Sequence, residues 1–196
     1  MKSHKDMEQQ TVRKFTYSDY VTWDDDKRYE LINGVVYELS SPSAAHQEVS
    51  MRLVIKIDTF IDKKNCKAFH APLDVRLNYD TFDDTVVQPD ILVVCDKSKI
   101  DKSGILGAPD LVIEILSLST ASKDCLTKRL LYLKAGVKEY WIVDPFKKTI
   151  NVMILENNDY SLHEYKKKDK IKSIILKGLN LKVNEIFDNL EIDEDN

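Results

Sequence analysis

The fold is decided by residues 86–132, which read VVQPDILVVCDKSKIDKSGILGAPDLVIEILSLSTASKDCLTKRLLY. This stretch contains two apolar runs that are short enough to be buried strands, ILVVC at residues 91–95 and LVIEIL at residues 111–116. An acid accompanies each run where burial normally excludes one, Asp90 directly before the first and Glu114 inside the second. These two carboxylates are therefore the first candidates for a functional site.

Glu114 lies on a strand that is apolar on both alternating faces, which predicts a central position in a sheet. An unpaired carboxylate buried there costs several kcal/mol, so the sequence implies a bound cation or a basic partner nearby. Pro89 can begin a strand but hardly continue one, so Asp90 stands at the start of its strand and shares a face with Leu92 and Val94. If the two strands are neighbours, the two carboxylates converge.

A third charge, Lys128, comes from the helix that follows, which Ser119 or Ser122 can cap. Two carboxylates and one lysine leave net negative charge, which suits a hard divalent ion such as Mg²⁺ that prefers oxygen ligands. Such an ion would polarise a phosphate, while the lysine would orient a water or stabilise charge in the transition state. The helix is expected to pack through an apolar stripe of Leu126, Leu130, Leu133 and Val137, with Lys128 opposite, beside Leu131, Tyr132 and Ala135.

The chain resembles the PD-(D/E)XK nuclease superfamily, with Pro89-Asp90 as the first motif element and Glu114 as the acid of the second. It departs from that pattern at Leu116, where the superfamily has a lysine two residues after the acid. It is more closely similar to the Uma-two family of restriction-endonuclease-fold proteins, in which this lysine has moved to the following helix. Lys128, in KRLLYLKAGVKEYWIVDP, matches that position. The resemblance covers residues 29–187 and includes RYELINGVVYELSSPSAAHQ, QPDILVV and PDLVIEILSLST.

This resemblance implies an α/β fold with a restriction-endonuclease-like core, in which helices flank a mixed β-sheet. It also implies a metal-dependent endonuclease that hydrolyses phosphodiester bonds in DNA, with Asp90 and Glu114 holding Mg²⁺ or Mn²⁺ and Lys128 near the attacking water. Glu30 is expected to be a third acid near the metal, and its alternative is a solvated strand acid. A homodimer is expected, because two sites can then cut two strands.

His46 and Gln88 are further candidates, either for contact with the substrate or for support of the metal ligands. His46 lies in the first turn of a helix that Ser43 can cap, where exposed amides can meet a phosphate; its alternative is ordinary polar surface. A second function stays open, because Leu116 stands where the superfamily has its lysine. The chain can also be a non-catalytic binding or interaction protein, in which the charges of Asp90, Glu114 and Lys128 form a structural ion-pair cluster. A third, a hydrolase with a nucleophilic cysteine or serine, lacks a GxSxG motif.

Length and composition are those of an ordinary globular protein, with 196 residues of which 43% are hydrophobic and 32% charged. We expect one domain at residues 15–190, a loose segment at residues 1–14 and an acidic tail at residues 191–196. No apolar run reaches the length of a membrane span and MKSHKDMEQQ lacks the core of a signal peptide, so we expect a cytoplasmic protein without membrane contact. The net charge of -4 argues against broad nucleic-acid affinity but permits a local basic face.

Local signals predict several other features. Asn33-Gly34 predicts a tight hairpin, Ser43 begins a long amphipathic helix, and residues 66–79 alternate enough to form one strand. Asp110 belongs to a second Pro-Asp dipeptide and is expected to face solvent at the start of its strand. The cysteines are odd in number and lack a CxxC pair, so we expect reduced thiols at Cys66, Cys95 and Cys125.

Overall fold

The computed structural model describes residues 13–61, 65–117 and 123–191. Most of the predicted loose segment and acidic tail lie outside these ranges, so the predicted domain limits stay predictions. Within the described residues, none of the helices is long and apolar enough to cross a membrane. The cytoplasmic location also stays a prediction. The helices are α1 (Tyr17–Tyr20), α2 (Ala44–Ile61), the 3-10 helix η1 (Lys97–Lys99), α3 (Lys123–Ala135) and α4 (Asn184–Phe187).

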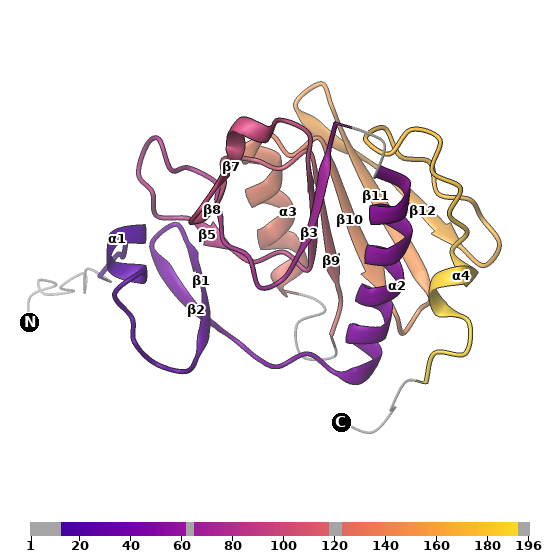
Figure 1. The fold of residues 1–196 in the computed structure, drawn as a ribbon, viewed down its shortest axis with the longest axis horizontal. Coiled ribbons are helices and arrows are strands. Elements are labelled where there is room, and N and C mark those ends of the chain that lie inside the picture. The colour runs from indigo at the N-terminus through magenta and orange to yellow at the C-terminus, as the bar shows by residue number, and fades with distance from the viewer. Residues whose placement is uncertain (1–12, 62–64, 118–122, 192–196) are drawn as a thin grey trace, which may run out of the picture.

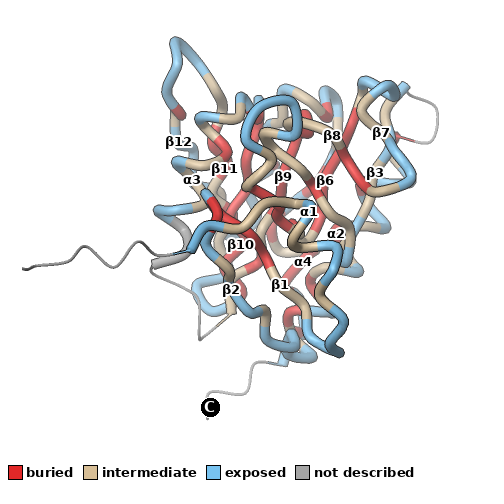
Figure 2. The backbone as a smooth tube through the Cα atoms, turned by 90° about the vertical axis from the view of Figure 1, so that its left-hand side faces the viewer, coloured by how far each residue is buried: buried red, intermediate tan, exposed pale blue. Residues whose placement is uncertain are grey.

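A large mixed sheet forms the centre of the fold, with strand order β12-β11-β10-β9-β6-β3. β9 and β10 are its parallel pair, and its other neighbouring strands run antiparallel. β9 therefore lies inside the sheet, as predicted for the strand that carries Glu114. Figure 2 shows that buried residues concentrate in the central strands β6, β9 and β10. The strands are β3 (Lys67–His70), β6 (Ile91–Val94), β9 (Leu111–Ile115), β10 (Glu139–Asp144), β11 (Thr149–Glu156) and β12 (Asp159–Lys166).

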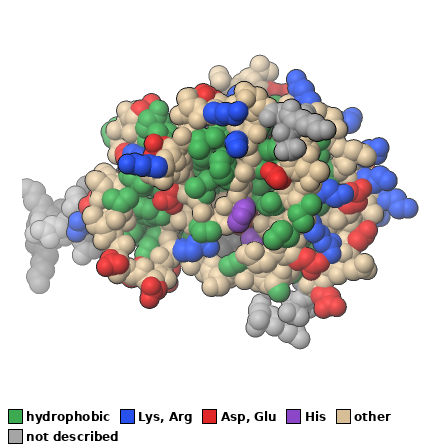
Figure 3. Space-filling model, in the orientation of Figure 1, with side chains coloured by type: hydrophobic (Ala, Val, Ile, Leu, Met, Phe, Trp, Pro, Cys, Tyr) green, Lys and Arg blue, Asp and Glu red, His purple; other side chains and the backbone are tan. Residues whose placement is uncertain are grey.

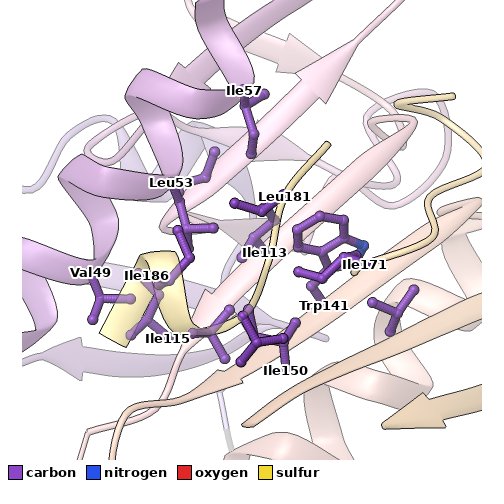
Figure 4. Close-up of a cluster of buried hydrophobic side chains, with 14 of the residues drawn as sticks. Val49, Leu53, Ile57, Ile113, Ile115, Trp141, Ile150, Ile171, Leu181 and Ile186 are labelled. Carbon is purple, nitrogen blue, oxygen red and sulfur yellow. The ribbon is translucent and has the colours of Figure 1, made fainter. Parts of the chain in front are cut away.

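Helices pack on both faces of the large sheet, α2 and α4 on one and α3 on the other (Figure 1). On the α2 face, Leu53 and Trp141 belong to one cluster of buried side chains (Figure 4). On the α3 face, Tyr132 packs in a second cluster with Val112 of β9. Successive side chains of β9 therefore pack alternately in the two clusters on opposite faces of the sheet. Glu114 lies on the same face as Val112.

A small sheet, which the sequence did not predict, has the strand order β2-β1-β5-β4-β8-β7. Four of these strands are only two or three residues long, too short to show a periodic pattern. The predicted hairpin at Asn33-Gly34 is confirmed, and both residues have the positive φ that a tight hairpin turn requires, 50° and 79°. The strands are β1 (Arg28–Ile32), β2 (Val35–Leu39), β4 (Val75–Arg76), β5 (Val86–Val87), β7 (Ile100–Asp101) and β8 (Gly104–Leu106).

Two of the segments that connect the sheets lie side by side, residues 71–74 from β3 to β4 and residues 88–90 from β5 to β6. They are joined where the Ala71 N–H donates to the Asp90 carbonyl at 3.0 Å. The prediction of a single strand at residues 66–79 is therefore wrong. Pro72, which has no N–H to donate to a ladder, lies at the interruption.

The buried face of α3 differs from the prediction. Leu126 and Leu130, expected in the buried stripe, are 65% and 52% exposed, while Tyr132 is fully buried. The helix turns Lys128 and Tyr132 inward because both bind Glu114 of β9. The proposed caps at residues 119 and 122 lie outside the described residues.

Cys66 and Cys95 form a disulfide, so the prediction of reduced thiols is wrong for this pair. Lys67 pairs with Val94 across the antiparallel strands β3 and β6, which places the two cysteines opposite each other one position further along. A single sequence does not show this strand pairing, which is why an odd cysteine count misled the prediction. The side chain of Cys125 lies outside the described part of the chain.

Candidate active site

Asp90 and Glu114 face each other across neighbouring strands, as the sequence predicted. Ile91 of β6 pairs with Ile113 of β9, and the two acids occupy the next positions toward the same end of the sheet. Asp90 Oδ2 accepts the backbone N–H of Ile115 at 2.7 Å, which fixes its carboxylate against β9. The strand pairing thus converts two acids that lie 24 positions apart in the printed sequence into one pair.

Lys128 joins Glu114 to a third acid from the small sheet. Its Nζ donates to Glu114 Oε1 at 3.0 Å and to Glu30 Oε1 at 2.9 Å. Glu30 is only 3% exposed, so it is not the solvated strand acid of the alternative interpretation. Tyr132, one helical turn after Lys128, donates its hydroxyl to Glu114 Oε1 at 2.6 Å.

The charges of this cluster shift one another's protonation. Burial raises the pKa of Glu114, with Asp90 and Glu30 adding to the rise and Lys128 and Tyr132 opposing it. Burial alone would lower the pKa of Lys128, but the carboxylates of Glu114 and Glu30 outweigh burial and raise it. Lys128 is therefore an ammonium ion at neutral pH.

His46 supports Asp90 from the first turn of α2. Its Nε2 donates to Asp90 Oδ2 at 3.1 Å, and the buried Nδ1 has no partner among the described residues. Burial lowers the pKa of His46, but the neighbouring carboxylates of Asp90 and Glu114 raise it above its usual value. Because the residue is buried, its alternative as ordinary polar surface is wrong. The predicted cap is confirmed, since the His46 N–H donates to Ser43 Oγ.

Gln88 supports the cluster from the segment that joins the two sheets. Its backbone N–H donates to Glu30 Oε1 at 2.9 Å. Its side chain is held by other protein groups, with Oε1 accepting from Arg28 and Nε2 donating to Asp74 and Tyr20. Gln88 therefore positions other residues of the site.

A cleft of about 990 Å³ opens onto this cluster. The predicted site residues all line it: Glu30, His46, Gln88, Asp90, Glu114 and Lys128. Lysine and arginine side chains gather instead along the right-hand edge of the face in Figure 3, over β12 and the segment after it. The exposed lysine-rich run at residues 166–172 belongs to that edge and does not line the cleft. The cleft is thus an acidic site with few cations of its own.

The donor set fits a hard divalent ion. Among the described residues, no protein group donates a hydrogen bond to Asp90 Oδ1 or Glu114 Oε2. The structure shows no cluster of three or more histidine, cysteine or acidic side chains with metal-binding geometry in the described ranges. Two carboxylates still suit Mg²⁺ or Mn²⁺, because such ions keep several waters or substrate oxygens as ligands.

Asp110 corrects one prediction, and two residues were missed. Asp110 is buried rather than solvent-facing, because it accepts the Cys95 N–H at 2.7 Å and a hydrogen bond from Lys138. Tyr132 was predicted only as an apolar neighbour, although its spacing from Lys128 places both side chains on one helix face. Arg28 stands two residues before Glu30 on β1, a spacing that marks one strand face.

Comparison with known proteins supports the fold and the expected family. A family model named Uma2 and described as "Putative restriction endonuclease" matches residues 17–184. An uncharacterised protein of Synechocystis sp. is 26% identical over 184 residues, which cover 89% of this chain and 92% of that protein. The crystal structure of an Anabaena variabilis protein, titled a putative nuclease belonging to DUF820, is 21% identical. It superposes with a TM-score of 0.73 over 88% of this chain and 97% of the other, and the predicted restriction-endonuclease-like α/β fold is confirmed.

Proposed function

We propose that this chain, which belongs to the Uma2 family of restriction-endonuclease-like proteins, is a metal-dependent endonuclease that hydrolyses phosphodiester bonds in DNA. One observation carries the proposal: Lys128 bridges two acids from different sheets beside Asp90, in an open cleft. Charged groups that converge in a cleft and shift one another's pKa values are typical of catalytic sites.

Asp90 and Glu114 would hold the metal ion through the carboxylate oxygens that no described protein group occupies. When bound, Mg²⁺ or Mn²⁺ supplies polarisation of a phosphate oxygen and a water of lowered pKa. The protein fixes each carboxylate through its other oxygen. Ile115 N–H and His46 hold Asp90, and Tyr132 holds Glu114.

Lys128 would act on the reacting phosphate or on the attacking water. An ammonium has three donors, and Glu30 and Glu114 accept two of them, which leaves one for a ligand in the cleft. Glu30 keeps the ammonium in place and is itself fixed by the Gln88 N–H. A cation positioned before the reaction stabilises negative charge that develops on the phosphate without further reorganisation.

A second function is favoured by the same contacts of Lys128. Its two ion pairs, at 2.9 and 3.0 Å, also describe a structural ion-pair cluster in a non-catalytic binding protein. Such a cluster would stabilise the junction of the two sheets and need no metal. Metal dependence therefore separates the two functions.

The first experiment measures thermal unfolding of the wild type and Glu114→Gln, with and without Mn²⁺. If Mn²⁺ is present at 100 times its Kd, it stabilises the wild type by about 2.7 kcal/mol, or about 5–10 °C for a chain of this size. Glu114→Gln is expected to lose this shift. Glu164→Gln, which removes the same charge from an exposed position of β12, is expected to keep it.

The second measurement is Mn²⁺-dependent cleavage of plasmid DNA by the same proteins. We expect cleavage by the wild type and Glu164→Gln and none by Glu114→Gln. A metal shift without cleavage of DNA would redirect the search to RNA. The absence of both a shift and cleavage in the wild type would reject the nuclease and favour the ion-pair cluster.

The proposed nuclease is further expected to act as a homodimer, because two sites can cut two strands. Light scattering on the purified chain measures its mass in solution directly. A monomer that cuts both strands of a duplex in one encounter would contradict the proposed dimer, but it would not contradict the proposed active site.

A further inference from the structure

We propose that Arg28 binds a backbone phosphate of the nucleic acid next to the phosphodiester that is cut, an inference that rests on the proposed function. Arg28 begins β1 and stands two residues before Glu30, so their side chains leave the same face of the strand. Two residues of a strand span about 7 Å. Both residues line the cleft that contains Asp90 and Glu114.

Arg28 differs from the other arginines of the chain in its partner. Its Nε and Nη2 donate to Gln88 Oε1 at 3.1 and 2.8 Å, and among the described residues it forms no ion pair. An amide oxygen is neutral, so it leaves the guanidinium charge uncancelled. Carboxylates pair with every other arginine, in the pairs Arg13–Asp19, Arg52–Glu48, Arg76–Asp83 and Arg129–Asp159.

Gln88 is held so that its amide oxygen faces Arg28. Its Nε2 donates to Asp74 Oδ1 at 2.9 Å and to the Tyr20 hydroxyl at 3.2 Å. A carboxylate only accepts, so the contact with Asp74 determines which end of the amide faces Arg28. Because the Gln88 N–H also binds Glu30, one residue positions both the free cation and the acid that holds Lys128.

Phosphate is the ligand that this arrangement suits. A guanidinium has five N–H donors, and Gln88 accepts two, which leaves three in a planar fork that matches phosphate oxygens. The rest of the cleft presents the carboxylates of Glu30, Asp90 and Glu114, which repel a nucleic-acid backbone. A protein of net charge -4 therefore needs a local cation where the strand enters the site.

The test measures the Kd of a fluorescein-labelled DNA duplex by anisotropy, in EDTA and over a series of KCl concentrations. We expect Arg28→Gln to raise Kd about tenfold, the loss of one charge-assisted contact. The slope of log K against log salt should become shallower by about 0.9, the value for one phosphate contact on duplex DNA. Arg28→Lys keeps the charge but not the fork, so it should keep the slope and show an intermediate Kd.

Arg129→Gln is the matched control, because it removes the same charge from an α3 residue that does not line the cleft. It should leave Kd and slope near those of the wild type. Three outcomes would each overturn the proposal. They are an equal loss of DNA affinity in Arg28→Gln and Arg129→Gln, an unchanged Kd in Arg28→Gln, and no DNA binding by the wild type. If Arg28→Gln fails to fold, Gln88→Met replaces it, with a higher Kd and an unchanged slope as the expected result.

Mn²⁺-dependent cleavage separates this proposal from the nuclease function. If the wild type and Arg28→Gln cleave DNA with the same dependence on enzyme concentration, the result supports the nuclease function and contradicts the phosphate contact of Arg28. If DNA binding depends on Arg28 but the protein neither binds Mn²⁺ nor cleaves DNA, the result supports the phosphate contact of Arg28 and contradicts the nuclease function. When both hold, Arg28→Gln should raise the enzyme concentration that gives half-maximal cleavage about tenfold.

Discussion

The two ends of the β6–β9 strand pair have nearly the same local structure and different surroundings. A Pro-Asp dipeptide precedes each strand, Pro89-Asp90 before β6 and Pro109-Asp110 before β9. Because the strands are antiparallel, each aspartate lies beside the far end of the other strand. Asp90 accepts the N–H of Ile115, the last residue of β9, and Asp110 accepts the N–H of Cys95, the residue after β6, at 2.7 Å in both cases. Each also accepts a hydrogen bond from one basic side chain, His46 or Lys138.

The difference lies in what other elements bring to each end. Lys138, 61% exposed, is the only cation paired with Asp110 in the described residues, and Asp110 does not line the cleft. At the other end, β1 adds Glu30 and α3 adds Lys128, next to the cleft. A Pro-Asp dipeptide therefore positions a carboxylate, but residues distant in sequence decide whether that carboxylate belongs to a reactive site.

The largest expected contrast is in DNA cleavage by Asp90→Asn and Asp110→Asn. Asp90→Asn removes a proposed metal ligand, so cleavage should fall by about 1000-fold or more. Asp110→Asn should cleave at nearly the wild-type rate while losing about 1–3 kcal/mol of unfolding free energy, because its buried hydrogen bonds weaken. Initial rates on plasmid DNA and urea unfolding measure the two effects. Equal loss of cleavage in both variants would mean that the two ends do not differ in function.

Removing the cation from each end should give the next largest contrast. Lys128→Ala leaves Glu30 and Glu114 without their shared partner, so we expect about 3 kcal/mol of destabilisation and about 100-fold slower cleavage. Lys138→Ala removes a mostly exposed lysine and should cost at most about 1 kcal/mol.

Urea unfolding and the Mn²⁺-dependent thermal shift test the Lys128 prediction together. Lys128→Ala should keep a metal shift, because Asp90 and Glu114 remain. A variant that keeps full cleavage would refute the role of Lys128. A Lys128→Ala protein that is unfolded at every Mn²⁺ concentration would assign this lysine chiefly to pairing the two glutamates.

Patterns carried by neighbouring residues were read correctly from the sequence. The Asn33-Gly34 turn, the Ser43 cap and the central strand of Glu114 depend on a few adjacent side chains, and the structure confirms all three. Convergence of Asp90 with Glu114 was predicted only on the condition that their two strands are neighbours, and the pairing of β6 with β9 meets that condition.

Features that depend on distant pairing were missed or misread. The stripe of Leu126 and Leu130 has the better apolar pattern, but ion pairs to Glu30 and Glu114 outweigh that pattern and turn Lys128 inward. Cys66 meets its partner only because β3 pairs with β6. The small sheet beyond its predicted hairpin escaped prediction for the same reason, since its other strands have only two or three residues and carry no signal of their own.

The smallest expected contrast concerns the hydroxyl of Tyr132, which has no counterpart at the Asp110 end among the residues that the structure describes. Tyr132→Phe removes one hydrogen bond to Glu114 and should cost about 1.5–3 kcal/mol of unfolding free energy. This hydrogen bond lowers the pKa of Glu114, so its loss should raise that pKa further and weaken Mn²⁺ binding increasingly as the pH falls. Tyr160→Phe is the control, because it removes a buried hydroxyl that donates to the Val137 carbonyl. Both variants should unfold more easily, but only Tyr132→Phe should show a smaller Mn²⁺-dependent thermal shift at acidic pH. Equal thermal shifts in the two variants would mean that Tyr132 does not influence metal binding.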